Sequence, residues 1–206
     1  MSPQPLRREA TYADLVALPD NVVGEIIDGV LHLQARPAPP HAIAGSSMGA
    51  DLNYLFGRKL DDPQGPGGWW ILDEPELALG RQVLVPDVAG WLRERMPQRP
   101  STAQFHLPPD WVCEVVSPGT ARKDRMQKLP IYAEHGVRWA WLVDPLNQTL
   151  EAFELEGKRW FLLGSWVGDA PARVTPFAEV ELAMARWWED GTVVEPAADT
   201  QASVDP

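Results

Sequence analysis

Residues 22–33 consist of two short apolar segments on either side of Asp28-Gly29. Asp-Gly is favoured in two-residue hairpin turns because both central positions need positive φ. The pattern therefore predicts a β-hairpin near the N-terminus. Just before it, residues 11–18 predict a short helix with Thr11 as N-cap and Asp14 three residues on. A two-stranded hairpin is only marginally stable alone, so it has to pack against further elements.

The rest of the chain alternates between helical and extended patterns. Ser117-Pro118 should start a helix that ends near Gly136, and Pro130 should kink or split it. Residues 111–116 are apolar enough for a strand buried on both faces. Further elements are expected at 41–60 (helix), 76–80 and 82–91 (strands), 137–144 (strand), and 149–155 with 159–163 (hairpin). This order predicts an α/β (α+β) fold with a mixed central sheet flanked by helices.

Length and composition suggest one soluble domain. The 206 residues fit a domain at 1–195, followed by a tail at 196–206 whose Pro/Ala/Asp/Thr/Ser composition predicts disorder. The single cysteine, Cys113, excludes an internal disulfide. We see no secretory signal and no stretch near the roughly 18 apolar residues of a membrane span. These observations predict a cytoplasmic protein without membrane association.

Two acidic residues occur within apolar, strand-like segments. Asp87 lies in Val-Pro-Asp-Val and Glu114 in Val-Cys-Glu-Val-Val. A buried carboxylate is costly unless it is paired or bound to a metal. Mg²⁺ prefers oxygen ligands, usually one or two carboxylates with water and phosphate. Either acid alone could be a structural ion-pair member, but the two together favour a metal site that hydrolyses phosphodiesters.

The helix after Glu114 carries three polar residues at four-residue spacing, Asp124, Lys128 and Tyr132. Spacing alone favours a surface Asp124–Lys128 pair, although Lys128 could also reach back over the Glu114 strand. Alternation along the strand places Cys113 on the face opposite Glu114.

Three other polar features lie in segments that could contribute to the site. Glu25 fits a solvated edge position or a site position equally well, and His41 fits a capping or packing role better than a ligand role. The basic residues Arg122, Lys123 and Arg125 could contact phosphates, but such clusters are usually just solvated.

The order of these segments resembles the Uma2 family of restriction-endonuclease-like proteins. The shared pieces are Glu25-Ile26-Ile27-Asp28-Gly29, His41, Pro86-Asp87-Val88, Pro109–Pro118, Asp124…Lys128…Tyr132…Gly136-Val137 and Trp141–Pro145. The resemblance covers roughly residues 11–163 and implies the PD-(D/E)XK nuclease fold. It implies metal binding by Asp87 and Glu114, with Glu25 as an accessory acid. The lysine of the superfamily pattern, two residues after Glu114, is Val116 here; the resemblance implies that Lys128 replaces it.

Two functions follow as hypotheses. The first is a Mg²⁺- or Mn²⁺-dependent endonuclease that cuts DNA, with Asp87, Glu114, Glu25 and Lys128 at its site. The second is an inactive protein of the same fold that serves as a binding or assembly module. The net charge of −11 counts against non-specific nucleic-acid binding but less against a metal-loaded nuclease. RNA as the substrate stays open, and a homodimer is expected only by analogy with enzymes that cut two strands.

Overall fold

A computed structural model describes residues 8–34, 36–59 and 65–188. Its centre is a six-stranded sheet in the order β11-β10-β9-β8-β6-β3. Neighbouring strands run antiparallel except for β8 and β9, which are parallel, so the sheet is mixed. The strands are β3 (Trp69–Asp73), β6 (Val88–Leu92), β8 (Trp111–Val115), β9 (Trp139–Asp144), β10 (Thr149–Glu156) and β11 (Arg159–Val167).

The N-terminal hairpin belongs to a second sheet of five strands in the order β2-β1-β5-β4-β7. The strands are β1 (Gly24–Ile27), β2 (Val30–Leu33), β4 (Glu76–Leu79), β5 (Gln82–Leu84) and β7 (Gln104–Phe105). The hairpin turn is as predicted, with φ of 50° at Asp28 and 75° at Gly29. The mixed α+β fold is confirmed, but the sequence did not predict that the strands would divide between two sheets.

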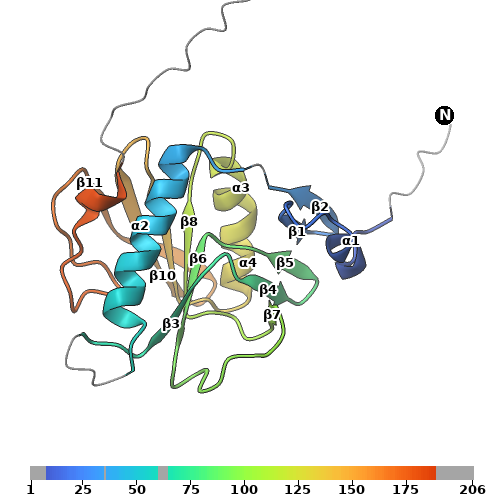
Figure 1. Ribbon diagram of the computed structural model, residues 1–206, viewed down its shortest axis with the longest axis horizontal. Coiled ribbons are helices and arrows are strands. Elements are labelled where there is room, and N and C mark those ends of the chain that lie inside the picture. The colour runs from blue at the N-terminus through green and yellow to red at the C-terminus, as the bar shows by residue number, and fades with distance from the viewer. Residues whose placement is uncertain (1–7, 35, 60–64, 189–206) are drawn as a thin grey trace, which may run out of the picture.

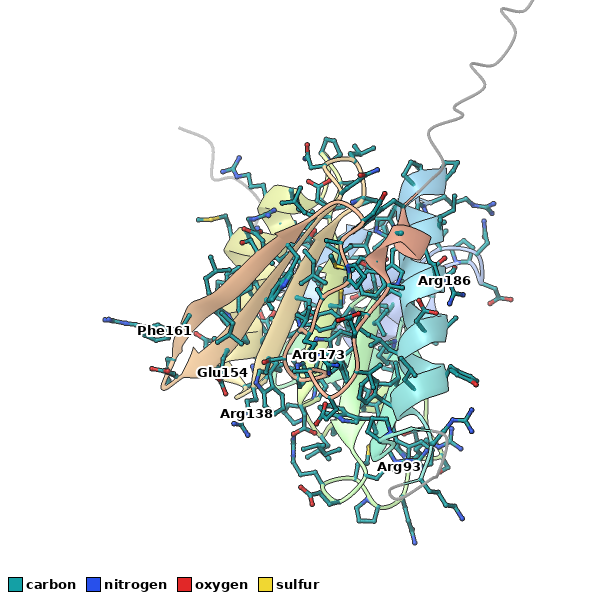
Figure 2. All side chains as sticks on the ribbon, turned by 90° about the vertical axis from the view of Figure 1, so that its left-hand side faces the viewer. Arg93, Arg138, Glu154, Phe161, Arg173 and Arg186 are labelled. Carbon is teal, nitrogen blue, oxygen red and sulfur yellow. The ribbon has the colours of Figure 1, made fainter. Side chains whose placement is uncertain are left out.

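Both faces of the six-stranded sheet are covered, as Figures 1 and 2 show from two directions. Helix α2 (Pro39–Phe56) and the C-terminal segment with its 3₁₀ turn η2 (Met184–Trp187) cover one face. Arg186 of η2 forms an ion pair of 2.9 Å with Asp51 of α2. Helix α4 (Leu129–Glu134) and the five-stranded sheet cover the other face. Helix α1 (Tyr12–Val16) packs beside the hairpin, and Thr11 and Asp14 form its capping box.

Strand β8 is buried along its whole length, as expected for a central strand. Its side chains alternate between the two apolar clusters that the sheet separates. Trp111, Cys113 and Val115 face α2, whereas Val112 packs with α4 on the other side. The prediction that Cys113 and Glu114 point to opposite faces is confirmed. Glu114 therefore points toward α4 and the smaller sheet.

The chain passes from one sheet to the other at Val85-Pro86-Asp87. The sequence predicted one continuous strand over residues 82–91, which is wrong: β5 ends at Leu84 and β6 begins at Val88. Proline has no backbone N–H to donate to a sheet and fixes its own φ, so a strand breaks readily there. Asp87 is consequently the residue that enters the six-stranded sheet from the gap.

The segment after β8 is helical but irregular. It consists of α3 (Ala121–Lys123), a π-helical turn η1 (Asp124–Lys128) and α4. Pro130 was expected to disrupt a single helix, and the disruption lies one turn earlier, at η1. There the N–H of Leu129 bonds the carbonyl of Asp124, five residues back. A π turn is a known site of helix irregularity, and it widens the helix next to the functional residues described below.

Tryptophans fill the larger apolar cluster rather than a surface platform. Trp111 and Trp141 pack edge to face with ring centroids 5.0 Å apart, and Phe177 lies 5.0 Å from Trp111. Such edge-to-face pairs stabilise the core beyond the apolar area that the rings bury. No helix within the described residues has the length and apolar character needed to cross a bilayer. The predicted tail at 196–206 lies outside the described residues.

Candidate active site

Asp87 and Glu114 lie directly opposite each other on neighbouring strands. Val88 pairs with Cys113 in the antiparallel register of β6 and β8, which places the residue before Val88 beside the residue after Cys113. The N–H of Val115 donates to Oδ2 of Asp87 over 2.7 Å. The Asp87 carboxylate thus replaces a backbone acceptor where β6 has not yet begun. Sheet pairing alone brings together two acids that are 27 residues apart in the sequence.

Glu114 is buried, and both of its carboxylate oxygens have donors. The Lys128 ammonium donates to Oε2 over 2.8 Å, and the Tyr132 hydroxyl donates to Oε1 over 2.6 Å. Burial raises the pKa of Glu114 well above its ordinary value, against the lowering effect of Lys128. The four-residue spacing of Lys128 and Tyr132 survives the π turn, because both side chains reach the same carboxylate.

Lys128 is 2% exposed and contacts three acceptors. Besides Glu114, its ammonium lies 3.0 Å from Oε1 of Glu25 and donates to the carbonyl of Val85 over 3.1 Å. Burial opposes its charge, but the neighbouring carboxylates outweigh burial and raise its pKa. Two of its three N–H groups thus donate to protein acceptors, and the ammonium is also paired with the Glu25 carboxylate. The expectation of a surface Asp124–Lys128 pair is wrong, because both residues are buried.

Glu25 comes from the first strand of the hairpin and is fully buried. It accepts from the N–H of Val85 over 3.0 Å and from the Lys123 ammonium over 2.7 Å, in addition to its contact with Lys128. Burial would raise the pKa of Glu25, but Lys128 and Lys123 outweigh it and lower the pKa to about 2. The sequence left open a solvated edge position or a site position for Glu25. The solvated position is wrong, because Glu25 is buried.

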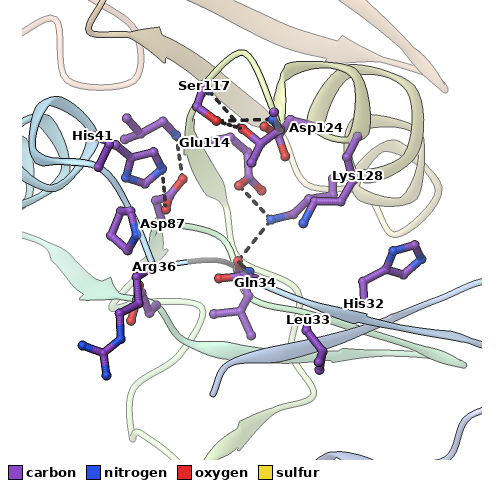
Figure 3. A pocket seen from close by; sticks show the side chains of 18 residues that line it. His32, Leu33, Gln34, Arg36, His41, Asp87, Glu114, Ser117, Asp124 and Lys128 are labelled. Atoms are coloured by element: carbon purple, nitrogen blue, oxygen red, sulfur yellow. Dashed lines mark hydrogen bonds and ion pairs between the residues drawn. The ribbon is translucent and has the colours of Figure 1, made fainter. Parts of the chain in front are cut away.

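Asp87, Glu114 and Lys128 line one cavity of about 480 Å³ together with His41, Lys123 and Asp124 (Figure 3). Nε2 of His41 lies 3.4 Å from Oδ1 of Asp87, so the histidine of α2 belongs to the site and is not only a packing residue. Ser117 sits at the cavity wall, where its hydroxyl accepts from the N–H of Thr120 over 3.3 Å. The helix expected to start at Ser117-Pro118 begins at Ala121, with Thr120 as its N-cap.

The site contains more negative than positive charge. Fully ionised, the carboxylates of Glu25, Asp87, Glu114 and Asp124 exceed the ammonium groups of Lys123 and Lys128 by two charges, with His41 counted as neutral. Burial raises the pKa of three of these acids, Asp87, Glu114 and Asp124. A divalent cation bound beside these acids would favour their ionised forms and compensate their charge.

The donor set also suits a divalent ion in kind. Asp87 and Glu114 offer carboxylate oxygens side by side at the cavity, and each oxygen keeps lone pairs beyond the bonds described above. Among the described residues no three acids, histidines or cysteines form a ready-made metal cage. Mg²⁺ does not require one, because it keeps several waters and is often bound by one or two carboxylates plus substrate phosphate. The residues present therefore fit such an ion.

Comparison with known proteins agrees with this geometry. The sequence model of Uma2, a family described as putative restriction endonucleases, matches residues 11–185. The chain belongs to the Uma2 family. Its fold is similar to the crystal structure of a putative nuclease belonging to DUF820 from Anabaena variabilis ATCC 29413. The TM-score is 0.69 at 22% identity, covering 87% of this chain and 97% of the other, and at this identity the likeness shows the fold alone. A search of curated proteins gave no match.

Two residues of this Uma2 protein have other positions than the sequence predicted. His41 was expected to cap or pack and Lys123 to be solvated, but both line the cavity and contact acids of the site. The spacing of Asp124, Lys128 and Tyr132 was the signal that this helix faces the Glu114 strand. Applied to Lys123, the same reasoning would have failed, because its partner Glu25 lies 98 residues away.

Glu25 is expected to give the Uma2 protein an acid-labile contribution to stability. Its pKa in the folded state, about 2, lies below the ordinary value of 4.5. The contribution is therefore fully present above pH 4.5 and is lost as the pH falls toward 2; its size is about 3 kcal/mol. Urea unfolding at pH 6, 4 and 3 should show that the difference in unfolding free energy between the wild type and Glu25→Gln becomes smaller as the pH falls. The exposed-site control Glu156→Gln should not show this trend, and a constant difference for Glu25→Gln would contradict the expectation.

Proposed function

We propose that this Uma2 protein is a metal-dependent endonuclease that hydrolyses phosphodiester bonds of DNA. The observation that supports the proposal most is the pair of acids, Asp87 and Glu114, which come from adjacent segments and line one cavity. Mg²⁺ or Mn²⁺ held by these carboxylates would lower the pKa of bound water and offset charge on the attacked phosphate. The family's description and the nuclease-like fold point in the same direction.

The remaining residues would hold the two acids in place. Lys128 and Tyr132 fix the Glu114 carboxylate, and the Val115 N–H with His41 fixes that of Asp87. Glu25 compensates Lys128 from the far side. Lys128 acts as a positioning residue in this arrangement, because its donors are directed to protein acceptors. A preorganised carboxylate pair loses little entropy when it binds an ion or a phosphate.

A second candidate is an inactive member of the same fold that serves as a binding or assembly module. The observation that favours it is the closed environment of Glu114, whose two oxygens already have donors in Lys128 and Tyr132. Asp87 is more open, with 22% of its side chain exposed, and no arginine is among the partners found for either acid. This openness favours the nuclease over the module.

Purified protein should cut DNA in the presence of Mg²⁺ or Mn²⁺ and should stop cutting when EDTA is added. The substrates are supercoiled plasmid, linear duplex, single-stranded DNA and RNA. Cutting of DNA supports the proposal as stated, whereas cutting of RNA alone would replace the substrate. Inertness on every substrate with either metal would favour the binding module.

We also propose that the protein forms a homodimer, because two-fold pairing suits the cutting of two strands. Sedimentation of the same sample tests this.

A further inference from the structure

The two lysines of the site, Lys123 and Lys128, differ in how many of their ammonium N–H groups already contact protein acceptors. Lys128 is 2% exposed; its ammonium donates to Glu114 over 2.8 Å and to the Val85 carbonyl over 3.1 Å, and it forms an ion pair of 3.0 Å with Glu25. A substrate that drew on this ammonium would disturb these contacts. Breaking an ion pair inside a buried cluster leaves a carboxylate uncompensated, which is costly. Lys128 is therefore poorly placed to contact a ligand.

Lys123 is placed differently. Its side chain is 21% exposed and lines the same cavity, one helical turn before Lys128. One of its three donors has an acceptor among the described residues, Oε2 of Glu25 at 2.7 Å. Among the described residues no further acceptor is found for its other two donors, and the side chain lines the cavity. Glu25 is fully buried and fixed by the Val85 N–H as well, so it anchors the lysine from below.

The cavity needs such a cation if a phosphodiester is to enter it. Asp87, Glu114 and Asp124 all line the wall, and a phosphate that approached them would meet negative charge. The other basic groups at the wall are His32, the exposed Arg36, and His41, which faces Asp87. Among the described residues neither His32 nor Arg36 pairs with a buried carboxylate, as Lys123 does with Glu25. A cation held at the wall by a buried anion supplies directed positive charge without reorganisation.

We propose that Lys123 contacts the scissile phosphate and is a catalytic residue of this protein, and that Glu25 is its positioning residue. This inference rests on the proposed nuclease function. It replaces the substrate-facing role that family resemblance assigns to Lys128. It also explains why an acid on the N-terminal hairpin belongs to a site whose proposed metal ligands, Asp87 and Glu114, lie at the six-stranded sheet.

The test compares Lys123→Gln, Lys123→Arg and the neighbouring control Arg122→Gln. Glutamine can still donate to Glu25 but lacks the charge, and Arg122 is exposed and does not line the cavity. The measurement is single-turnover cleavage of a labelled DNA duplex at saturating concentration with Mn²⁺. Lys123→Gln should slow cleavage by about 100-fold, the usual loss when one charge-stabilising donor is removed. Lys123→Arg should recover most of that loss, and Arg122→Gln should cleave like the wild type.

Glu25→Gln supplies a second readout. Because Glu25 acts through Lys123, the double variant Glu25→Gln/Lys123→Gln should cleave no more slowly than Lys123→Gln alone. Additive losses would show that Glu25 acts independently of Lys123. Cleavage by Lys123→Gln at the wild-type rate would overturn the role of Lys123 while leaving the nuclease function intact. A wild type that cuts nothing would overturn both.

Discussion

Asp87→Asn should reduce metal-dependent DNA cleavage by about 1000-fold. The substitution removes one of the two carboxylates that would hold the ion, and a metal ion contributes several kcal/mol to stabilising the transition state. The asparagine carbonyl oxygen can still accept the bond that Val115 donates to Asp87, so the fold should persist. The measurement is plasmid cleavage with Mn²⁺, together with the shift in melting temperature that Mn²⁺ causes.

The matched control is Asp144→Asn. Asp144 ends β9 and caps the following turn, accepting from the N–H groups of Leu146 and Asn147 over 3.1 and 3.0 Å, and it does not line the cavity. The substitution Asp144→Asn removes the same charge from the end of another strand. It should change neither the cleavage rate nor the shift in melting temperature that Mn²⁺ causes. Equal cleavage by the wild type and Asp87→Asn would exclude Asp87 as a metal ligand. If cleavage fell but the Mn²⁺ shift persisted, the ion would be bound elsewhere.

Lys128→Met should lower the free energy of unfolding by about 3–5 kcal/mol, because it leaves the buried carboxylates of Glu25 and Glu114 without their shared cation. For a chain of this size the melting temperature should fall by roughly 10 °C. The measurement is thermal unfolding in metal-free buffer near pH 7. Lys158→Met, an exposed turn position between β10 and β11, should change stability by less than about 0.5 kcal/mol.

A second substitution shows whether the loss comes from unpaired charge. The double variant Lys128→Met/Glu114→Gln removes one of the two carboxylates that have lost the Lys128 ammonium. Part of the lost free energy of unfolding should therefore return. The double variant would be no better than Lys128→Met if the loss came only from altered packing. A cost below about 1 kcal/mol for Lys128→Met would contradict the central place of this ammonium in the cluster.

Local structure was largely predictable. Asp28-Gly29 specifies a turn by its backbone preference, and the apolar run at 111–116 specifies a central strand by its length and composition. The wrong prediction of one strand over 82–91 has a local cause, because Pro86 interrupts it. The apolar residues on both sides of Pro86 favoured a continuous strand nevertheless. Strand β3 was not predicted, because Trp69-Trp70-Ile71-Leu72 follows a Gly/Pro loop without alternation.

The partners of the site residues were less predictable. Asp87 and Glu114 were selected because an acid in an apolar strand needs a partner, and the tertiary structure then placed the two acids side by side. Lys123 and His41 carry no such signal, since a lysine in a helix and a histidine after prolines are ordinary surface residues. Their roles follow only from what lies opposite them.

The sequence by itself determined the hairpin turn, the central strand, the identity of the unusual acids and the family. Tertiary structure alone decided that the hairpin would bring Glu25 to Lys123 and Lys128, and that the chain would change sheets at Pro86 to set Asp87 opposite Glu114. The physical reason is range. Turns and strands depend on the preferences of neighbouring residues. A charge cluster depends instead on contacts between residues as far apart in sequence as Glu25 and Lys128, which form only when both sheets and α4 bury their apolar faces together.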